Sequence, residues 1–167
     1  MSENQSLVLN HRQIGQKITR MAYEIYERNS SEEEIFFAGI SGMGKIFADL
    51  LAEKLQSISP LRASVMEVIL DKNSLVQGEV RLSSNSNLEN KCLILVDDVL
   101  NTGKTLAYAL KPFLEIPIKK MELAVLVNRS HKLFPVSADY TGLELSTTLN
   151  EHIAVDLTKE SYTVHLH

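Results

Sequence analysis

A single cysteine, Cys92, is present among the 167 residues, and the longest apolar runs are short. One cysteine cannot form a disulfide framework within the chain, which fits a reducing compartment. The short apolar runs exclude a membrane-spanning helix, and the first residues lack the apolar core of a signal peptide. We therefore expect a cytoplasmic protein that makes no membrane contact.

The sequence also has fewer basic than acidic residues. The 17 lysine and arginine residues are outnumbered by 21 aspartate and glutamate residues, which gives a formal net charge of -4. Surfaces that bind nucleic-acid backbones favour stripes of basic residues, so this balance disfavours RNA or DNA as the main partner. The five histidines show no metal-ligand spacing, and we predict no metal site built from protein groups alone.

The sequence has enough apolar residues for one folded domain. It is 44% hydrophobic and 23% charged, which is ordinary for a globular protein. A chain of this length buries roughly 70% of its unfolded surface, and no internal repeat divides it. We expect a single domain over residues 1–167.

Continuous apolar runs alternate with apolar residues at helical spacing. The runs predict buried strands at residues 35–40, 63–70, 92–96 and 121–127. The helical spacing predicts helices at residues 10–28, around 47–55 and at 105–114, with Pro112 expected to bend or shorten the last one. This order is typical of an α/β fold with a mainly parallel sheet flanked by helices.

Two segments fall outside this alternation. Residues 71–90 are rich in turn-forming residues and contain SSNSNLEN, so we predict a mobile loop there. Residues 138–167 hold short strand-like pieces and no clear helix.

Two turns follow predicted strands, where the ligands of parallel sheets bind. GISGMGKI at residues 39–46 approaches the phosphate-binding pattern G-x-x-x-x-G-K-[ST], but Ile46 replaces the hydroxyl that holds Mg²⁺. LILVDDVLNTGKT at residues 93–105 ends like that pattern, but Asp98 stands where glycine is needed and would repel a triphosphate. The LILVDD part could instead be the acidic strand of a P-loop NTPase whose loop is residues 39–45, so that alternative stays open.

A ribose 5-phosphate explains more of the second stretch. The strand delivers Asp97 and Asp98, and a turn then exposes backbone N–H groups at a helix start. Such a turn suits a monophosphate, and two adjacent carboxylates suit a pair of neighbouring hydroxyls. The small residues Thr102 and Gly103 allow close backbone approach, and Lys104 adds positive charge.

The same residues carry a resemblance. VDDVLNTGKT resembles the phosphoribosyl-diphosphate (PRPP) motif of type I phosphoribosyltransferases. The segments LILVDDVLNTGKTLAYAL, ELAVLVNRSHKLFPVSADYTG, AYEIYERN, EEEIFFAGI and EVILDKNSL are similar to the PyrR family of pyrimidine-operon attenuators and uracil phosphoribosyltransferases. The likeness, from about residue 10 to 157, implies a type I phosphoribosyltransferase fold with a small C-terminal hood. It also implies transfer of ribose 5-phosphate from PRPP to a nucleobase, uracil first, with diphosphate release, Mg²⁺ held mainly through PRPP, and a homo-oligomer.

The resemblance further implies roles for single residues. Asp97 and Asp98 would hold the ribose hydroxyls and, with Lys72 of the mobile loop, form the catalytic set. The other expected groups are Val99, Leu100, Asn101, Thr102, Gly103, Lys104 and Thr105 for the 5-phosphate, Ser41, Gly42, Met43 and Gly44 for the diphosphate, and Arg129, His131, Asp139 and Tyr140 for the base. Residues 71–90 would close over the site, and a hood of residues 138–167 would cover the base.

Most departures from the family pattern remove or weaken positive charge. Ser41 and Met43 stand where the diphosphate loop typically has two arginines, and Asn101 and Lys104 replace a tyrosine and an arginine of the PRPP motif. A diphosphate leaving group needs cationic partners, so we expect slower turnover. Two functions therefore stay open beside the NTPase: a phosphoribosyltransferase, and a weakened PRPP or nucleotide binder that regulates pyrimidine genes through RNA.

Overall fold

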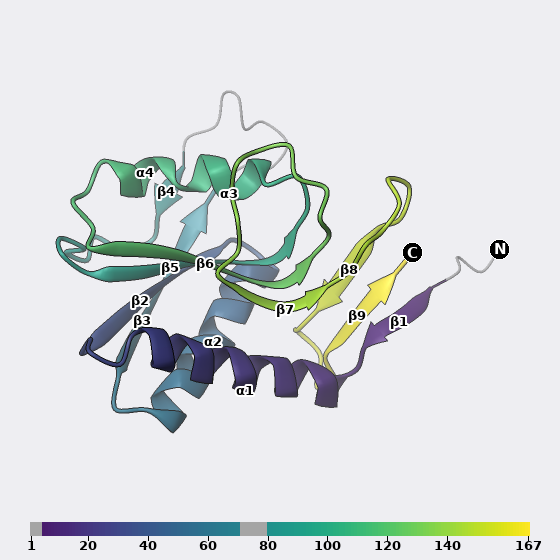
Figure 1. The fold of residues 1–167 in the computed structure, drawn as a ribbon, viewed down its shortest axis with the longest axis horizontal. Coiled ribbons are helices and arrows are strands. Elements are labelled where there is room, and N and C mark those ends of the chain that lie inside the picture. The colour runs from purple at the N-terminus through teal and green to yellow at the C-terminus, as the bar shows by residue number, and fades with distance from the viewer. Residues whose placement is uncertain (1–4, 71–79) are drawn as a thin grey trace.

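A six-stranded sheet forms the centre of the computed structural model, which describes residues 5–70 and 80–167 (Figure 1). Its strand order is β4-β3-β2-β5-β6-β7. The strands are β2 (Glu34–Ile40), β3 (Arg62–Ile69), β4 (Arg81–Leu82), β5 (Cys92–Leu100), β6 (Lys120–Asn128) and β7 (Tyr140–Glu144). All neighbours pair in parallel except β4, which is antiparallel to β3. The mainly parallel sheet predicted from the sequence is confirmed, and its carboxyl ends meet at one edge.

Helices cover both faces of this sheet. α1 (His11–Arg28) and α2 (Met43–Ile58) lie on one face, and α3 (Lys104–Ala109) and α4 (Lys111–Leu114) lie on the other (Figure 1). The helix predicted over residues 105–114 is thus split, because Pro112 stands at the start of α4. Each face has its own apolar core, which joins the sheet to its helices.

The start of α1 follows directly from the local sequence. The Asn10 side chain accepts a hydrogen bond from the Gln13 N–H, and the Gln13 side chain accepts one from the Asn10 N–H. This reciprocal capping fixes the first turn. Ile14, Met21 and Ile25 then recur on one side of the helix and are fully buried.

A smaller antiparallel sheet stands beside the large one and is called the hood here. It consists of β1 (Ser6–Leu9), β9 (Thr163–Leu166) and β8 (Ile153–Asp156) (Figure 1). Its make-up differs from the predicted residues 138–167. β7 pairs with β6 and belongs to the large sheet, while β1 comes from the opposite end of the chain. Short strands carry no mark of their partner, so the sequence could not show this pairing.

Part of the predicted mobile loop is built into the sheet. β4 pairs with the end of β3, and Leu88 is buried in the core between the sheet and α3. Leu82 packs against the same core, so two leucines anchor a segment that looks turn-rich overall. The prediction for residues 71–79, including catalytic Lys72, lies outside the described residues.

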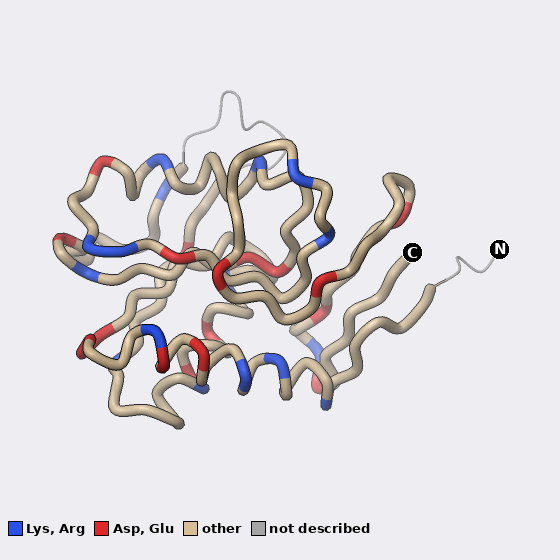
Figure 2. The backbone as a smooth tube through the Cα atoms, viewed as in Figure 1, with Lys and Arg blue, Asp and Glu red and all other residues tan. Residues whose placement is uncertain are grey.

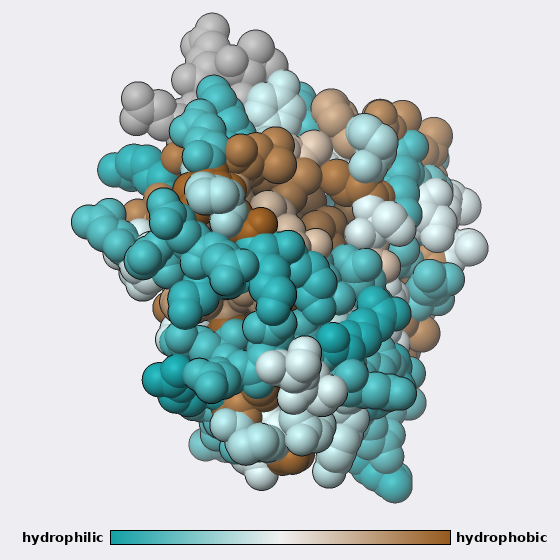
Figure 3. All heavy atoms as spheres, turned by 60° about the vertical axis from the view of Figure 1, so that its left-hand side comes forward, coloured by the Kyte–Doolittle hydropathy of each residue, from teal (hydrophilic) through white to brown (hydrophobic). Residues whose placement is uncertain are grey.

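Charges of both signs are interspersed along the chain, and one face of the molecule has separate hydrophilic and hydrophobic regions (Figures 2 and 3). Lysine and arginine are interspersed with aspartate and glutamate along the chain, for example on α1 (Figure 2). On the face seen in Figure 3, hydrophilic side chains cover the lower part and hydrophobic ones gather in the upper part. Across residues 5–70 and 80–167, no helix combines the length and apolarity needed to cross a membrane.

Candidate active site

Asp97 and Asp98 lie within β5 and not after it. The strand was predicted to end at residue 96, but its pairing with β6 continues to Leu100. Asp97 Oδ1 accepts a hydrogen bond from the Asp98 N–H at 2.9 Å, and Asp98 Oδ1 accepts one from the Val99 N–H at 2.9 Å. Asp97 is only 2% exposed, while Asp98 is half-buried. Both carboxylates are thereby fixed at the carboxyl edge of the sheet, where such folds bind ligands.

The turn after β5 requires the glycine at residue 103. Gly103 has a φ of 87° and stands at the start of α3. A Cβ atom added there would lie 2.5 Å from Val136 Cγ2. The carbonyl oxygen of Thr102 accepts hydrogen bonds from the N–H groups of Leu133 and Phe134, at 2.8 and 3.1 Å. The turn is therefore held tightly by the segment that follows β6.

The predicted diphosphate loop lies against the acid pair. β2 and β5 are neighbours in the sheet, so the turn after β2 comes close to the end of β5. A Cβ atom added at Gly44 would lie 2.9 Å from Asp97 Oδ1, so a larger residue there would displace the Asp97 carboxylate. The N–H and hydroxyl of Ser41 both donate to the carbonyl oxygen of Val68, at 2.9 and 3.0 Å. Two segments that are far apart in sequence thus share one site.

One continuous segment supplies most of the lining of a pocket of about 250 Å³ at this edge. Its lining comprises Asp97, Asp98, Val99, Leu100, Asn101, Thr102, Gly103, Lys104, Thr105, Leu106, His152 and Ile153. The structure therefore brings every residue predicted for the ribose 5-phosphate to one pocket. The wall formed by His152 and Ile153 comes from the start of β8, at the hood.

The geometry argues against a P-loop. Gly39 lies inside β2, and α2 begins at Met43, so only residues 41 and 42 connect the two elements. A connection of this length cannot wrap around a triphosphate. Lys45 is also engaged along α2, where its Nζ lies 2.8 and 2.9 Å from the two carboxylate oxygens of Asp49. The P-loop NTPase alternative is therefore not supported.

Arg129 and His131, predicted to contact the base, are both bound to the segment before β8. The Arg129 guanidinium donates to Thr147 Oγ1 and to Asn101 Oδ1, each at 2.9 Å. Nε2 of His131 lies 3.0 Å from the same Thr147 hydroxyl. Arg129 is 9% exposed, so its side chain is held inside the protein. The contact of either residue with a base stays a prediction.

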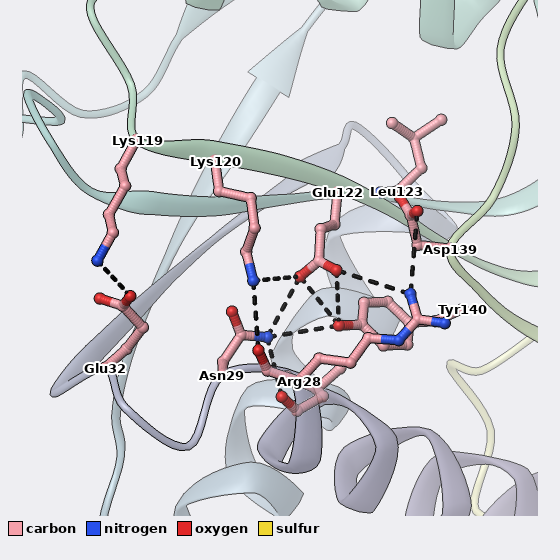
Figure 4. A network of polar contacts seen from close by, with 10 residues as sticks. Arg28, Asn29, Glu32, Lys119, Lys120, Glu122, Leu123, Asp139 and Tyr140 are labelled. Carbon is pink, nitrogen blue, oxygen red and sulfur yellow. Dashed lines mark hydrogen bonds and ion pairs between the residues drawn. The ribbon is translucent and has the colours of Figure 1, made fainter.

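Asp139 and Tyr140 are held in a separate polar network. The Tyr140 hydroxyl lies 2.9 Å from each carboxylate oxygen of Glu122, which also accepts a hydrogen bond from Asn29 Nδ2 at 3.2 Å (Figure 4). Burial and this hydrogen-bonded carboxylate raise the pKa of Tyr140 well above its ordinary value. Asp139 Oδ2 accepts a hydrogen bond from the Leu123 N–H at 2.8 Å. Neither residue is part of the described lining of the pocket, and their role toward the base stays a prediction.

The acid pair is the natural place for a hard cation bound together with a ligand. Among the described residues, no group of three or more histidine, cysteine, aspartate or glutamate side chains could hold a metal alone. Carboxylate oxygens suit Mg²⁺, which usually takes its remaining ligands from water and substrate phosphates. Asp97 and Asp98 therefore fit an ion that arrives on a phosphorylated substrate.

Residues 4–160 match the model of the phosphoribosyl transferase domain. The chain belongs to this family. Its relatives include the bifunctional protein PyrR of Streptococcus mutans serotype c, 37% identical over 146 residues that cover 84% of this chain and 81% of the relative. The bifunctional protein pyrR of Enterococcus faecalis strain OG1RF is 35% identical over 147 residues, with coverage of 84% and 83%. This phosphoribosyltransferase is thus PyrR-like over most of its length.

Solved structures of phosphoribosyltransferases have the same fold as this chain. A hypoxanthine phosphoribosyl transferase of Trypanosoma cruzi superposes with a TM-score of 0.76 at 15% identity, covering 88% of this chain and 82% of the other. A hypoxanthine-guanine phosphoribosyltransferase of Bacillus anthracis gives 0.74 at 18% identity, with coverage of 84% and 82%. The predicted fold class is confirmed.

The sequence of this phosphoribosyltransferase did not point to His152 and Ile153 as pocket residues. Histidine spacing offers no signal, because His152 is alone in the local sequence. The position of His152 depends on its pairing with His167, whose N–H donates to the His152 carbonyl at 2.8 Å and whose carbonyl accepts from the His152 N–H at 3.1 Å. The topology of the hood thus brings His152 and Ile153 to the pocket that holds the acid pair.

Proposed function

We propose that this phosphoribosyltransferase transfers the ribose 5-phosphate of PRPP to a nucleobase, with uracil as the first candidate. One observation carries the proposal. A single unbroken segment from Asp97 to Thr105 supplies two carboxylates, a glycine turn and Lys104 to one pocket. Ribose 5-phosphate carries two neighbouring hydroxyls on its ring and a phosphate on C5, which matches that order of groups. The family membership supports the same reaction.

The acid pair serves the sugar. Asp97 and Asp98 accept hydrogen bonds from the 2- and 3-hydroxyls and place negative charge beside C1 of the ribose. Positive charge develops there as the bond to diphosphate breaks and the base nitrogen bonds to C1. Because the two carboxylates are already fixed by backbone N–H groups, they need little reorganisation in the transition state.

The phosphates bind on the two sides of the acids. The turn around Gly103, with Lys104, holds the 5-phosphate, and residues 41–44 face the leaving diphosphate. Mg²⁺ supplies charge neutralisation on the diphosphate when it is bound with PRPP. Ser41 and Met43 bring no positive charge, and the Ser41 N–H is bound to the Val68 carbonyl, so the backbone N–H groups of residues 42–44 serve that side of the site. Losing one charged hydrogen bond costs about 1.5–3 kcal/mol, so two losses slow turnover by roughly a hundredfold or more.

Diphosphate release is the direct assay. The purified protein is incubated with PRPP, Mg²⁺ and a panel of bases that includes uracil, cytosine, hypoxanthine and guanine. We expect slow release with uracil, and none when Asp98→Asn replaces the wild type. If none of the bases in the panel leads to diphosphate release, the protein has no transferase activity toward them and the proposal is contradicted.

A second function is supported by the likeness to proteins named bifunctional PyrR, whereas the missing cations disfavour turnover and RNA binding alike. We propose that nucleotide binding regulates pyrimidine genes through RNA when turnover is weak. A gel-shift titration compares a pyrimidine-operon leader RNA with a shuffled RNA, with and without uridine 5′-monophosphate. Equal affinity for both RNAs at physiological salt would exclude this role.

Self-association and a cytoplasmic location complete the proposal. Light scattering during gel filtration tests the first, and we expect a dimer or a larger assembly. A monomer at micromolar concentration would contradict it.

A further inference from the structure

We infer that Arg129 is a positioning residue that locks the hood-side wall of the pocket to the phosphate turn. In this proposal it acts through Asn101 and the segment 147–151, in place of the base contact that the family resemblance implies. This inference rests on the proposed binding of ribose 5-phosphate by the turn. It concerns how the site recognises the rest of a nucleotide.

The guanidinium of Arg129 is shared between two segments. Nη1 donates to Asn101 Oδ1 at 2.9 Å, on the phosphate turn. Nε donates to Thr147 Oγ1 at 2.9 Å, and Nη2 donates to the carbonyl oxygens of Thr148 and Glu151 at 3.2 and 2.6 Å. One rigid, planar cation therefore joins the turn to the segment that leads into β8.

The arginine itself has little freedom to move. It is 9% exposed, and its main-chain N–H donates to the carbonyl oxygen of Leu100 at 3.0 Å, at the end of β5. Four side-chain hydrogen bonds in a buried site leave it poorly placed to turn toward a ligand. Its charge-assisted bonds are the strong kind, so they couple the two segments effectively.

The coupling reaches the pocket wall through the backbone. Glu151, whose carbonyl Arg129 holds, is followed immediately by His152 and Ile153, which line the same pocket as the acid pair. On the other side, Asn101 lines the same pocket. Asn101 is also one of the departures from the family motif, so its amide oxygen gives this chain a link that a tyrosine ring could not form in the same way.

The consequence is specific to ligand size. In this proposal the ribose 5-phosphate is held by the acid pair and the turn, and the base of uridine 5′-monophosphate adds contacts with the hood-side wall. Loosening the Arg129 link should therefore weaken the nucleotide and spare the sugar phosphate. A purely structural role would weaken both alike.

The test uses calorimetric titration of the full chain with these two ligands. Thr147→Val removes the acceptor of Arg129 Nε, and with it the partner of His131 Nε2, without changing a pocket residue, whereas Arg129→Lys removes the planar fork and leaves Thr147 in place for His131. Arg20→Lys is the matched control, because Arg20 Nη2 donates to the carbonyls of Thr141 and Gly142 at 3.1 and 2.8 Å but does not line the pocket. Should Arg129→Lys fail to fold, Thr147→Val decides alone.

We expect both variants to weaken uridine 5′-monophosphate by about tenfold and ribose 5-phosphate by less than about twofold. Arg20→Lys should leave both affinities unchanged. Equal loss for the two ligands, or no loss for the nucleotide, would overturn the positioning role alone. Failure of the wild type to bind ribose 5-phosphate would instead overturn the proposed function, and the inference with it.

Discussion

Gly103 shows how a single residue shapes the site. Its φ of 87° is unfavourable for any residue with a Cβ atom, and that atom would also meet Val136 at 2.5 Å. The substitution Gly103→Ala should lower the free energy of unfolding by about 1–3 kcal/mol. It should also weaken ribose 5-phosphate, because the turn has to move. Chemical denaturation and calorimetry measure the two effects.

Gly15 offers the matched control for this prediction. It lies within α1, and a Cβ atom added there meets nothing within 4 Å. Gly15→Ala should raise the free energy of unfolding by about 0.5–1 kcal/mol and leave ligand affinity unchanged. Equal effects of the two substitutions on affinity would refute the special role of the turn.

At the scale of elements, the turn between β2 and α2 limits how diphosphate is held. Met43→Arg restores one cation at the first residue of α2. We expect PRPP affinity to rise by about tenfold relative to that of ribose 5-phosphate, because only PRPP carries the diphosphate. Titration of both ligands against Met43→Arg and the neutral control Met43→Gln gives the ratio. A rise shared equally by both ligands would point to general attraction and not to a diphosphate site.

Local elements were largely predictable from the sequence, and their partners were not. Buried strands and the acid pair follow from continuous apolar runs and from the LILVDD stretch, and the break at Pro112 follows from ring geometry. β5 extends four residues beyond its apolar run because pairing with β6 continues through polar residues. The hood depends on pairing between β1 and β9 at opposite chain ends, which no local pattern encodes.

The same limit applies to the site. Asp97 and the turn could be named from spacing and resemblance, since they are contiguous. The engagement of Arg129 with Asn101 and Thr147 could not, because it depends on three segments folded together. Likewise, the burial of Tyr140 against Glu122 depends on the register between β6 and β7.

For the whole molecule, the buried network around Glu122 joins the end of α1 to the large sheet. Tyr140 is fully buried, and Arg28 and Lys120 lie 3.8 and 3.5 Å from the Glu122 carboxylate (Figure 4). Tyr140→Phe removes the hydroxyl that binds this carboxylate. We expect a loss of about 1–3 kcal/mol in the free energy of unfolding at neutral pH, measured by urea denaturation.

The pH dependence of stability tests the same network. The folded-state pKa of Tyr140 is raised by desolvation and by the Glu122 carboxylate. The stabilisation that Tyr140 provides is therefore complete below the ordinary tyrosine pKa of about 10. It declines as the pH rises above that value, because Tyr140 then loses its proton in the unfolded chain before it does so in the folded protein. The stability difference between wild type and Tyr140→Phe should shrink as the pH increases beyond about 10. A difference that stays constant there would contradict the raised pKa.

The most direct test of the ribose-phosphate site is calorimetric titration with PRPP and Mg²⁺, run on the wild type and on Asp98→Asn. The half-buried Asp98 can be changed with little effect on the core, and the variant keeps the shape of the side chain while removing its charge. We expect saturable binding to the wild type and an affinity at least about tenfold lower for the variant. No detectable binding of PRPP to the wild type, together with tight binding of ATP, would contradict the ribose-phosphate site.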